Sequence, residues 1–240
     1  MLTDQPDSNK LISIASGKGG VGKTWFSITL AQALSKKGKR VLLFDGDLGL
    51  ANLDIQLGLM PKQDISAVIA GRLTLQQAII KYQEGGFDII AGQSGAGGLM
   101  NLAANRLQTL GEQLSMISKQ YDIVMLDLGA GVERTVRLLA HHSSMCIVVL
   151  TDEPTSLTDA YAFIKLLHKE RPDIKIKILT NIVNSIREGE RTYGTILKAC
   201  QGFLKFSPSL LGVIRRDVKV RDSIRAQIPL LTRHPTSEAA

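Results

Sequence analysis

Short apolar runs rich in β-branched residues alternate along the chain with longer amphipathic segments. The short runs, broken by Gly, Asp or Lys, predict strands, and the longer segments predict helices. The predicted strands are Leu11–Ser16, Arg40–Asp45, Phe87–Ala91, Asp122–Asp127, Met145–Thr151, Ile174–Asn181 and Leu210–Ile214. The predicted helices are Gly22–Lys37, Leu73–Tyr82, Arg106–Lys119, Glu133–His141, Leu157–Glu170, Arg187–Ala199 and Val218–Ala226.

Several predicted strands are almost wholly apolar, for example IVMLD at 123–127 and CIVVL at 146–150. Such strands are typical of a sheet that helices cover on both faces. The strand–helix alternation therefore predicts an α/β fold with a single doubly wound, mostly parallel sheet. In sheets of this kind ligands bind beyond the carboxyl ends of the strands, so we expect the functional residues directly after strands.

The 240 residues contain no internal repeat, low-complexity tract or long linker. We predict one domain over residues 11–231, between flexible segments at 1–10 and 232–240. Hydrophobic residues make up 44% of the chain and charged ones 21%, which excludes wholesale disorder. No apolar run approaches the roughly 18 residues of a membrane span, and the polar start lacks the apolar stretch of a secretory signal.

Two cysteines, Cys146 and Cys200, lie far apart in the sequence without the spacing of a metal site. We predict that both are reduced and buried. This cysteine usage, together with the absence of a signal segment, favours a cytoplasmic protein.

A glycine-rich segment follows the first predicted strand and precedes the first predicted helix. It reads Gly17-Lys18-Gly19-Gly20-Val21-Gly22-Lys23-Thr24 and matches the phosphate-loop pattern G-x-x-x-x-G-K-[ST]. Its backbone N–H groups and the helix N-terminus are expected to bind nucleotide phosphates, with Trp25 next to them. We expect Lys23 to be exposed to the ligand and to reach the β- and γ-phosphates, and the Thr24 hydroxyl to ligate Mg²⁺.

Aspartates follow or end two apolar strands, where a magnesium–nucleotide site needs carboxylates. Asp45 and Asp47 come at the end of one strand, and Asp127 ends the run YDIVMLD. We predict Asp45 and Asp127 as metal-site residues beside Thr24. Leu128 stands where many P-loop ATPases have a catalytic Glu, so Asp47 is the first candidate to orient the attacking water and Asp54 its rival.

The segment KGGVGKT, with its additional lysine at position 18, resembles the deviant Walker A motif of the MinD/ParA superfamily. The resemblance extends from about Lys10 to Pro229 and implies a P-loop NTPase fold and an ATP-dependent homodimer. In that dimer Lys18 would act in trans on the partner's nucleotide, so Lys18 and Lys23 join Asp47 as candidate catalytic residues.

Two further segments carry the resemblance. DGDLGLANLD at 45–54 is similar to switch I of MinD-type ATPases and implies roles for Asp45, Asp47 and Asn52. The stretch 127–131 is similar to their Walker B and switch II segment, in which Gly129 and Gly131 would allow movement when the γ-phosphate leaves.

Candidate base contacts follow from the same resemblance. Asn181 ends a predicted strand where related proteins place a base-contacting Asn, and Asp217 lies in a segment that lines their base pocket. The chain departs from the family at Arg215, where a Pro is common. For both Asn181 and Asp217 the alternative is an ordinary cap or turn role.

The stretch EPTSLTDAY at 153–161 resembles the FlhG/FleN branch, the MinD-like ATPases that set flagellar number. This implies a slowly hydrolysing Mg–ATP switch with a flagellar or polar-positioning protein partner, in the cytoplasm or at a pole. Composition accounts for the same stretch as a plain helix start. The N-terminal activating element of some FlhG proteins is represented only by Asp4-Gln5, and Thr232–Ala240 has no apolar face that would anchor a membrane.

The net charge is +7, and four units of it fall between Gly212 and Arg233. This makes a ParA-like, nucleoid-associated ATPase the main alternative, binding DNA nonspecifically, and a solvated helix face the plain one. The candidate DNA-binding residues are Arg215, Arg216, Lys219, Arg221 and Arg225. An iron–sulfur carrier ATPase would need paired cysteines, and Lys18 disfavours a small-molecule kinase.

Overall fold

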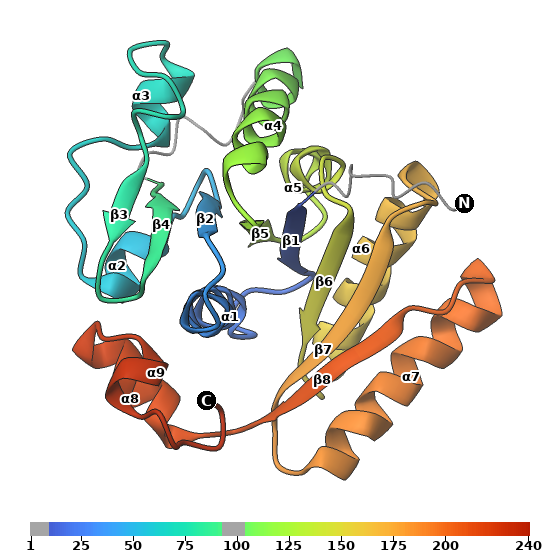
Figure 1. Ribbon diagram of the computed structural model, residues 1–240. Helices are drawn as coiled ribbons and strands as arrows, with labels where there is room; N and C mark the ends of the chain where they lie inside the picture. The colour runs from blue at the N-terminus through green and yellow to red at the C-terminus, as the bar shows by residue number, and fades with distance from the viewer. Residues whose placement is uncertain (1–9, 93–103) are drawn as a thin grey trace, which may run out of the picture.

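The computed structural model describes residues 10–92 and 104–240 and contains one sheet of eight strands (Figure 1). The spatial order is β3-β4-β2-β5-β1-β6-β7-β8, and every neighbouring pair is parallel except β3 and β4. The strands are β1 (Leu11–Ser16), β2 (Val41–Gly46), β3 (Ile80–Tyr82), β4 (Phe87–Ile90), β5 (Ile123–Ala130), β6 (Met145–Leu150), β7 (Lys175–Val183) and β8 (Ser209–Arg215). The predicted mostly parallel α/β sheet is confirmed.

Helices cover both faces of this sheet (Figure 1). They are α1 (Lys23–Lys36), α2 (Leu53–Leu57), α3 (Ile65–Ile69), α4 (Ala104–Ile117), α5 (Arg134–Ala140), α6 (Pro154–Glu170), α7 (Ile186–Leu204), α8 (Val218–Ala226) and α9 (Leu230–Arg233), with a short 3-10 turn at Ser118–Gln120. Helices α4 to α7 share one core with one face of the strands, and α1, α2 and α9 share the other. None of the helices in the described ranges is long and apolar enough to cross a membrane.

The predicted helix over Leu73–Tyr82 is wrong. Residues 74–79 form turns, and Ile80–Tyr82 is strand β3, which pairs antiparallel with β4 through a hairpin at Gly85 and Gly86. Two local effects account for this. The backbone N–H and hydroxyl of Thr74 both donate to Gln77 Oε1 and close a turn, and the apolar residues then alternate as in a strand.

Residues 232–240, expected as a flexible tail, pack against α1 and α8. Thr232 Oγ1 accepts a hydrogen bond from Gln32 Nε2 at 2.7 Å, and Arg233 pairs with Asp222 at 2.6 Å. Ala239 is buried, and its N–H donates to Asp217 at 3.3 Å. The sequence suggested freedom because these contacts use single polar groups and give no periodic pattern. The expected flexible start falls, apart from Lys10, outside the described residues.

Both cysteines are buried and free, as predicted. Burial raises the pKa of the Cys146 thiol to about 12 and that of Cys200 to about 11. A thiol of that pKa carries almost no thiolate at neutral pH, so neither residue is a nucleophile or a ready metal ligand.

Candidate functional site

The phosphate loop joins β1 to α1 in a conformation that three of its glycines make possible. Gly20 and Gly22 have φ of 79° and 86°, in the region that side-chain-bearing residues rarely adopt. Gly17 is required for another reason: a Cβ there would lie 2.1 Å from the backbone carbonyl carbon of Asp159 in α6. Helix α6 therefore fixes the start of the loop, and the motif's glycines serve packing as well as curvature.

We expect Gly17→Ala to lower the free energy of unfolding by about 3 kcal/mol, because backbone atoms of α6 must move to admit the methyl group. Gly19→Ala is the matched control, since a Cβ at Gly19 meets nothing within 4 Å and its φ is not positive. Urea unfolding of both variants measures the difference. Equal stabilities would show that α6 does not press on Gly17.

Lys23 lies inside the site, whereas the sequence analysis expected it to be exposed. Its side chain is 8% exposed, and its Nζ is 3.6 Å from Oδ1 of Asp127, which is 1% exposed. The hydroxyl of Ser27, one turn along α1, donates to the same carboxylate oxygen at 2.9 Å. Asp127 thus has both a cation and a hydrogen-bond donor from α1.

Asp45 and Asp127 are register partners on the neighbouring strands β2 and β5. The Asp45 carboxylate accepts backbone hydrogen bonds from Asp47, Asn52 and Leu53, each at 3.2 Å. Despite these donors, burial and the facing Asp127 raise the pKa of Asp45 to about 7. Two buried carboxylates on neighbouring strands are hard oxygen donors of the kind that suits Mg²⁺, and the third predicted ligand, Thr24, is half-buried at the start of α1.

The strand that carries Asp127 runs on to Ala130, so Asp127 lies within β5 and not at its end. Its side chain faces α1, and Leu128 points into the core on the opposite face of the sheet, fully buried. Leu128 therefore takes no part in the site. The carboxylate that orients the water is expected at another position, as the sequence predicted.

Asp47 lies where switch I meets switch II. Its Oδ1 accepts the N–H of Leu50 at 3.0 Å, and a Cβ on Gly129 would be 3.5 Å from its carboxylate. Its partner in switch I, Asn52, precedes α2 and donates from Nδ2 to the Leu50 carbonyl at 2.6 Å. The rival Asp54 accepts the N–H of Ile55 within the first turn of α2. Of the two acidic candidates, Asp47 is the one held against switch II.

Lys18 is engaged within its own chain. Its Nζ donates to Glu153 Oε2 at 2.6 Å and to Thr155 Oγ1 at 2.9 Å, both at the start of α6. This stretch stands out in the sequence only for its resemblance, and its contact with Lys18 was not predicted. An acidic side chain directly after a strand that lies beside the loop was the available signal.

Asn181 supports the phosphate loop from β7. Its Nδ2 donates to the Val21 carbonyl at 2.8 Å, and its Oδ1 accepts the N–H of Ile182, which has a positive φ of 59°. A Cβ on Gly22 would meet this amide at 2.5 Å. The amide that was expected to bind a base is thus occupied by backbone groups, although the residue lines the adjoining cavity.

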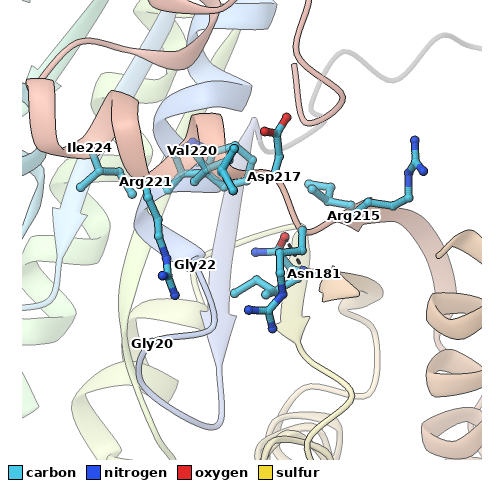
Figure 2. A pocket seen from close by; sticks show the side chains of 13 residues that line it. Gly20, Gly22, Asn181, Arg215, Asp217, Val220, Arg221 and Ile224 are labelled. Atoms are coloured by element: carbon cyan, nitrogen blue, oxygen red, sulfur yellow. Dashed lines mark hydrogen bonds between the residues drawn. The ribbon is translucent and has the colours of Figure 1, made fainter. Parts of the chain in front are cut away.

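A cavity of about 440 Å³ opens between the loop, the end of β7 and α8 (Figure 2). Its wall is mostly apolar and includes Ile182, Ile214, Val218, Val220 and Ile224, none of which was predicted from the sequence. Three arginines that were predicted only as DNA-binding residues, Arg215, Arg216 and Arg221, also line it. Trp25 and Asn181 complete it beside the loop. Its size and lining suit the nucleoside part of a ligand whose phosphates lie on the loop.

Asp217 lines this cavity and caps α8, and its carboxylate is hydrogen-bonded to backbone groups. Its carboxylate accepts the N–H of Lys219 at 2.8 Å and that of Ala239 at 3.3 Å, and Figure 2 shows it directed away from Gly20 and Gly22. The cap role that the sequence analysis kept as an alternative is the one present in this structure.

The chain is similar to known proteins both in sequence and in fold. Residues 9–179 match the family described as AAA domain. The antiactivator FleN of Pseudomonas aeruginosa is 36% identical over 231 residues, which cover 96% of this chain and 82% of FleN. MinD of Pyrococcus horikoshii, solved in complex with Mg-ADP, aligns with a TM-score of 0.80 at 26% identity over 96% of this chain and 91% of that one. The chain belongs to the MinD/ParA family of P-loop ATPases.

Within this MinD/ParA family the predicted FlhG/FleN branch is confirmed. Besides FleN, the flagellum site-determining protein YlxH of Helicobacter pylori is 35% identical over 199 residues. The match covers 82% of this chain and 66% of YlxH.

The basic cluster after β8 is partly neutralised in this family member. Arg215 pairs with Glu238 at 2.5 Å, and Arg233 pairs with Asp222. Figure 2 shows Arg215 extending away from the cavity and Arg221 extending toward the loop. Two arginines of the segment with the predicted local charge of +4 are thus ion-paired within the chain.

Proposed function

We propose that this protein is a Mg–ATP-dependent switch that dimerises with ATP, hydrolyses it slowly and regulates the number or placement of flagella. The observation that carries the proposal is the buried pairing of Asp45 with Asp127 beside Lys23, directly under the phosphate loop. Membership of the MinD/ParA family supports it, and so do the similar proteins FleN and YlxH.

Each residue has a role in this proposal. The loop's N–H groups bind the phosphates, and Lys23 moves from Asp127 to the β- and γ-phosphates when they arrive. Thr24, Asp45 and Asp127 would hold Mg²⁺, which supplies neutralisation of the phosphate charge. Asp47 orients the attacking water and accepts its hydrogen bond. Because Asp47 lies beside Gly129, loss of the γ-phosphate changes the conformation of both switch I and switch II.

Lys18 links nucleotide binding to dimerisation. In the single chain its ammonium is held by Glu153 and Thr155, so contact with a partner's nucleotide requires that it leave them. The Lys18 side chain is 39% exposed, so leaving Glu153 costs little free energy, because surface ion pairs are weak. The pair is therefore a resting position for Lys18 that a partner's phosphates replace.

We expect Lys18→Ala to bind ATP but to remain monomeric, because the contact across the interface is missing. Light scattering with ATP, with ADP and without nucleotide measures this. Lys37→Ala, an exposed lysine at the far end of α1, is the control and should dimerise like the wild type. Normal dimerisation of Lys18→Ala would leave the lysine with its local contact alone.

The cellular role rests on the antiactivator FleN and on YlxH. By analogy, the ATP-bound dimer would bind a protein partner, for which an activator is the first candidate, and release it after hydrolysis. Electron microscopy tests this by counting flagella in native cells that carry Lys18→Ala in place of the wild type. An altered number supports the flagellar output, and a normal number in cells lacking the protein altogether rejects it.

The alternatives have less support. An iron–sulfur carrier needs thiols at a dimer interface, whereas Cys146 and Cys200 are buried in β6 and α7. A DNA-bound positioning ATPase needs a basic face, and Arg215, one of the five candidate DNA-binding residues, is already paired with Glu238. Salt-dependent duplex binding remains the measurement that would favour the second alternative.

A further inference from the structure

Arg221 is one of the residues that line the cavity beside the phosphate loop. It lies on the first turns of α8, one position after Val220 and three before Ile224, which line the same cavity. Arg221 and Ile224 are three residues apart and therefore lie on one face of the helix. Figure 2 shows the Arg221 side chain extending from α8 across the cavity toward Gly20 and Gly22.

The charge of Arg221 has no acidic partner among the residues that the structure describes. Of the other two arginines in the cavity wall, Arg215 pairs with Glu238, whereas Arg216, like Arg221, has no ion pair with a described residue. Most of the cavity wall around the guanidinium is apolar. A guanidinium with five N–H donors in such surroundings is suited to bind an anion that enters the cavity.

Hydrogen bonds on two sides of α8 hold in place the helix that carries Arg221. Asp222 accepts hydrogen bonds from Arg233 and His234 at 2.6 Å, which ties the helix to the segment after α9. At the other end, Gln227 Nε2 donates to the Ile55 carbonyl of α2 at 2.8 Å. The position of Arg221 on α8 is thus fixed by the fold.

The loop presents an open surface to this arginine. A Cβ on Gly20 would meet nothing within 4 Å, so that part of the backbone is free to be approached. The apolar cavity suits a nucleoside, while Lys23 lies farther along the loop toward Asp127. The phosphate that would lie between the nucleoside in the cavity and the phosphates at Lys23 is the one attached to the sugar.

We propose that Arg221 binds the sugar-linked phosphate of a nucleoside 5′-phosphate in this cavity, as a binding residue supplied by α8. The proposal rests on the proposed function, since it assumes that a nucleotide occupies the loop. It also moves Arg221 from the candidate DNA-binding surface to the nucleotide site. Arg225, one turn later on α8 and not part of the cavity, stays outside it.

The experiment compares wild type, Arg221→Ala, Arg221→Lys and the control Arg225→Ala, each titrated with ADP, AMP and adenosine. Trp25 is the single tryptophan of the chain and lines the cavity, so its fluorescence reports binding. We expect Arg221→Ala to weaken ADP and AMP about tenfold, the loss of a hydrogen bond to a charged group. Adenosine should bind as before, Arg221→Lys should recover part of the loss, and Arg225→Ala should match the wild type.

Other results would separate the alternatives. Unchanged ADP affinity in Arg221→Ala overturns the inference, and so does an equal loss for adenosine, which indicates packing on the nucleoside. Binding of duplex DNA is measured as well. If Arg221→Ala binds ADP normally but its DNA binding depends less on salt than that of the wild type, Arg221 belongs to a surface that binds polyanions. If the wild type binds no nucleotide at all, the proposed function fails and not this step alone. Thermal unfolding without ligand should be equal in all four proteins, because Arg221 and Arg225 are both exposed.

Discussion

Lys23→Ala is expected to abolish ATP binding and also to destabilise the protein without nucleotide. The ammonium is the cation nearest to Asp127, and both side chains are buried. Without it, two facing carboxylates at Asp45 and Asp127 share a site from which water is largely excluded. Breaking a buried pair on one side costs about 3 kcal/mol, and we expect a loss of that order in urea unfolding. Calorimetry should show no measurable heat of ATP binding.

A second variant separates the two effects of Lys23. Lys23→Ala combined with Asp127→Asn removes the uncompensated charge as well as its partner, so stability should return while ATP binding should not. Ser27, which donates to Asp127 in the wild type, still finds an oxygen acceptor in the amide. If Lys23→Ala alone is as stable as the wild type, the buried pairing with Asp127 is not the resting state of the lysine.

The parts of the fold that were predictable are those in which local pattern and tertiary role agree. Apolar runs such as CIVVL are buried in the sheet and form β6, which ends at Leu150, one residue before the predicted end at Thr151. The phosphate loop was predictable because backbone curvature there depends on the glycines themselves. In 73–82, by contrast, a short apolar segment was compatible with helix or strand. Pairing with β4 decided between them, and that pairing is not a local property.

The site shows the same division. Which residues gather at the carboxyl ends of the strands followed from the sequence, but where their side chains point did not. The directions of the Lys18 and Asp217 side chains are set by partners far away in the chain, Glu153 and the N–H of Ala239, and Arg221 extends toward the loop without an acidic partner among the described residues. The sequence could count the charges after β8 but could not show that Glu238 removes one of them.

Asp47→Asn is expected to keep ATP affinity within about twofold and to lower the hydrolysis rate at least about 100-fold. The amide oxygen still accepts the N–H of Leu50, so switch I keeps its shape, but it no longer has the charge that orients and polarises the water. Phosphate release measures the rate, and light scattering should show that the ATP dimer persists, because hydrolysis no longer ends it.

The rival carboxylate provides the control for this result. Asp54 lies in the first turn of α2, and its carboxylate accepts the N–H of Ile55. The Asp54→Asn variant should therefore hydrolyse ATP at nearly the wild-type rate. The opposite outcome, full activity in Asp47→Asn and loss in Asp54→Asn, would transfer the role to Asp54. It would also require that α2 turn toward the nucleotide when ATP binds, since in this structure only Asp47 of the two lies against Gly129 of switch II.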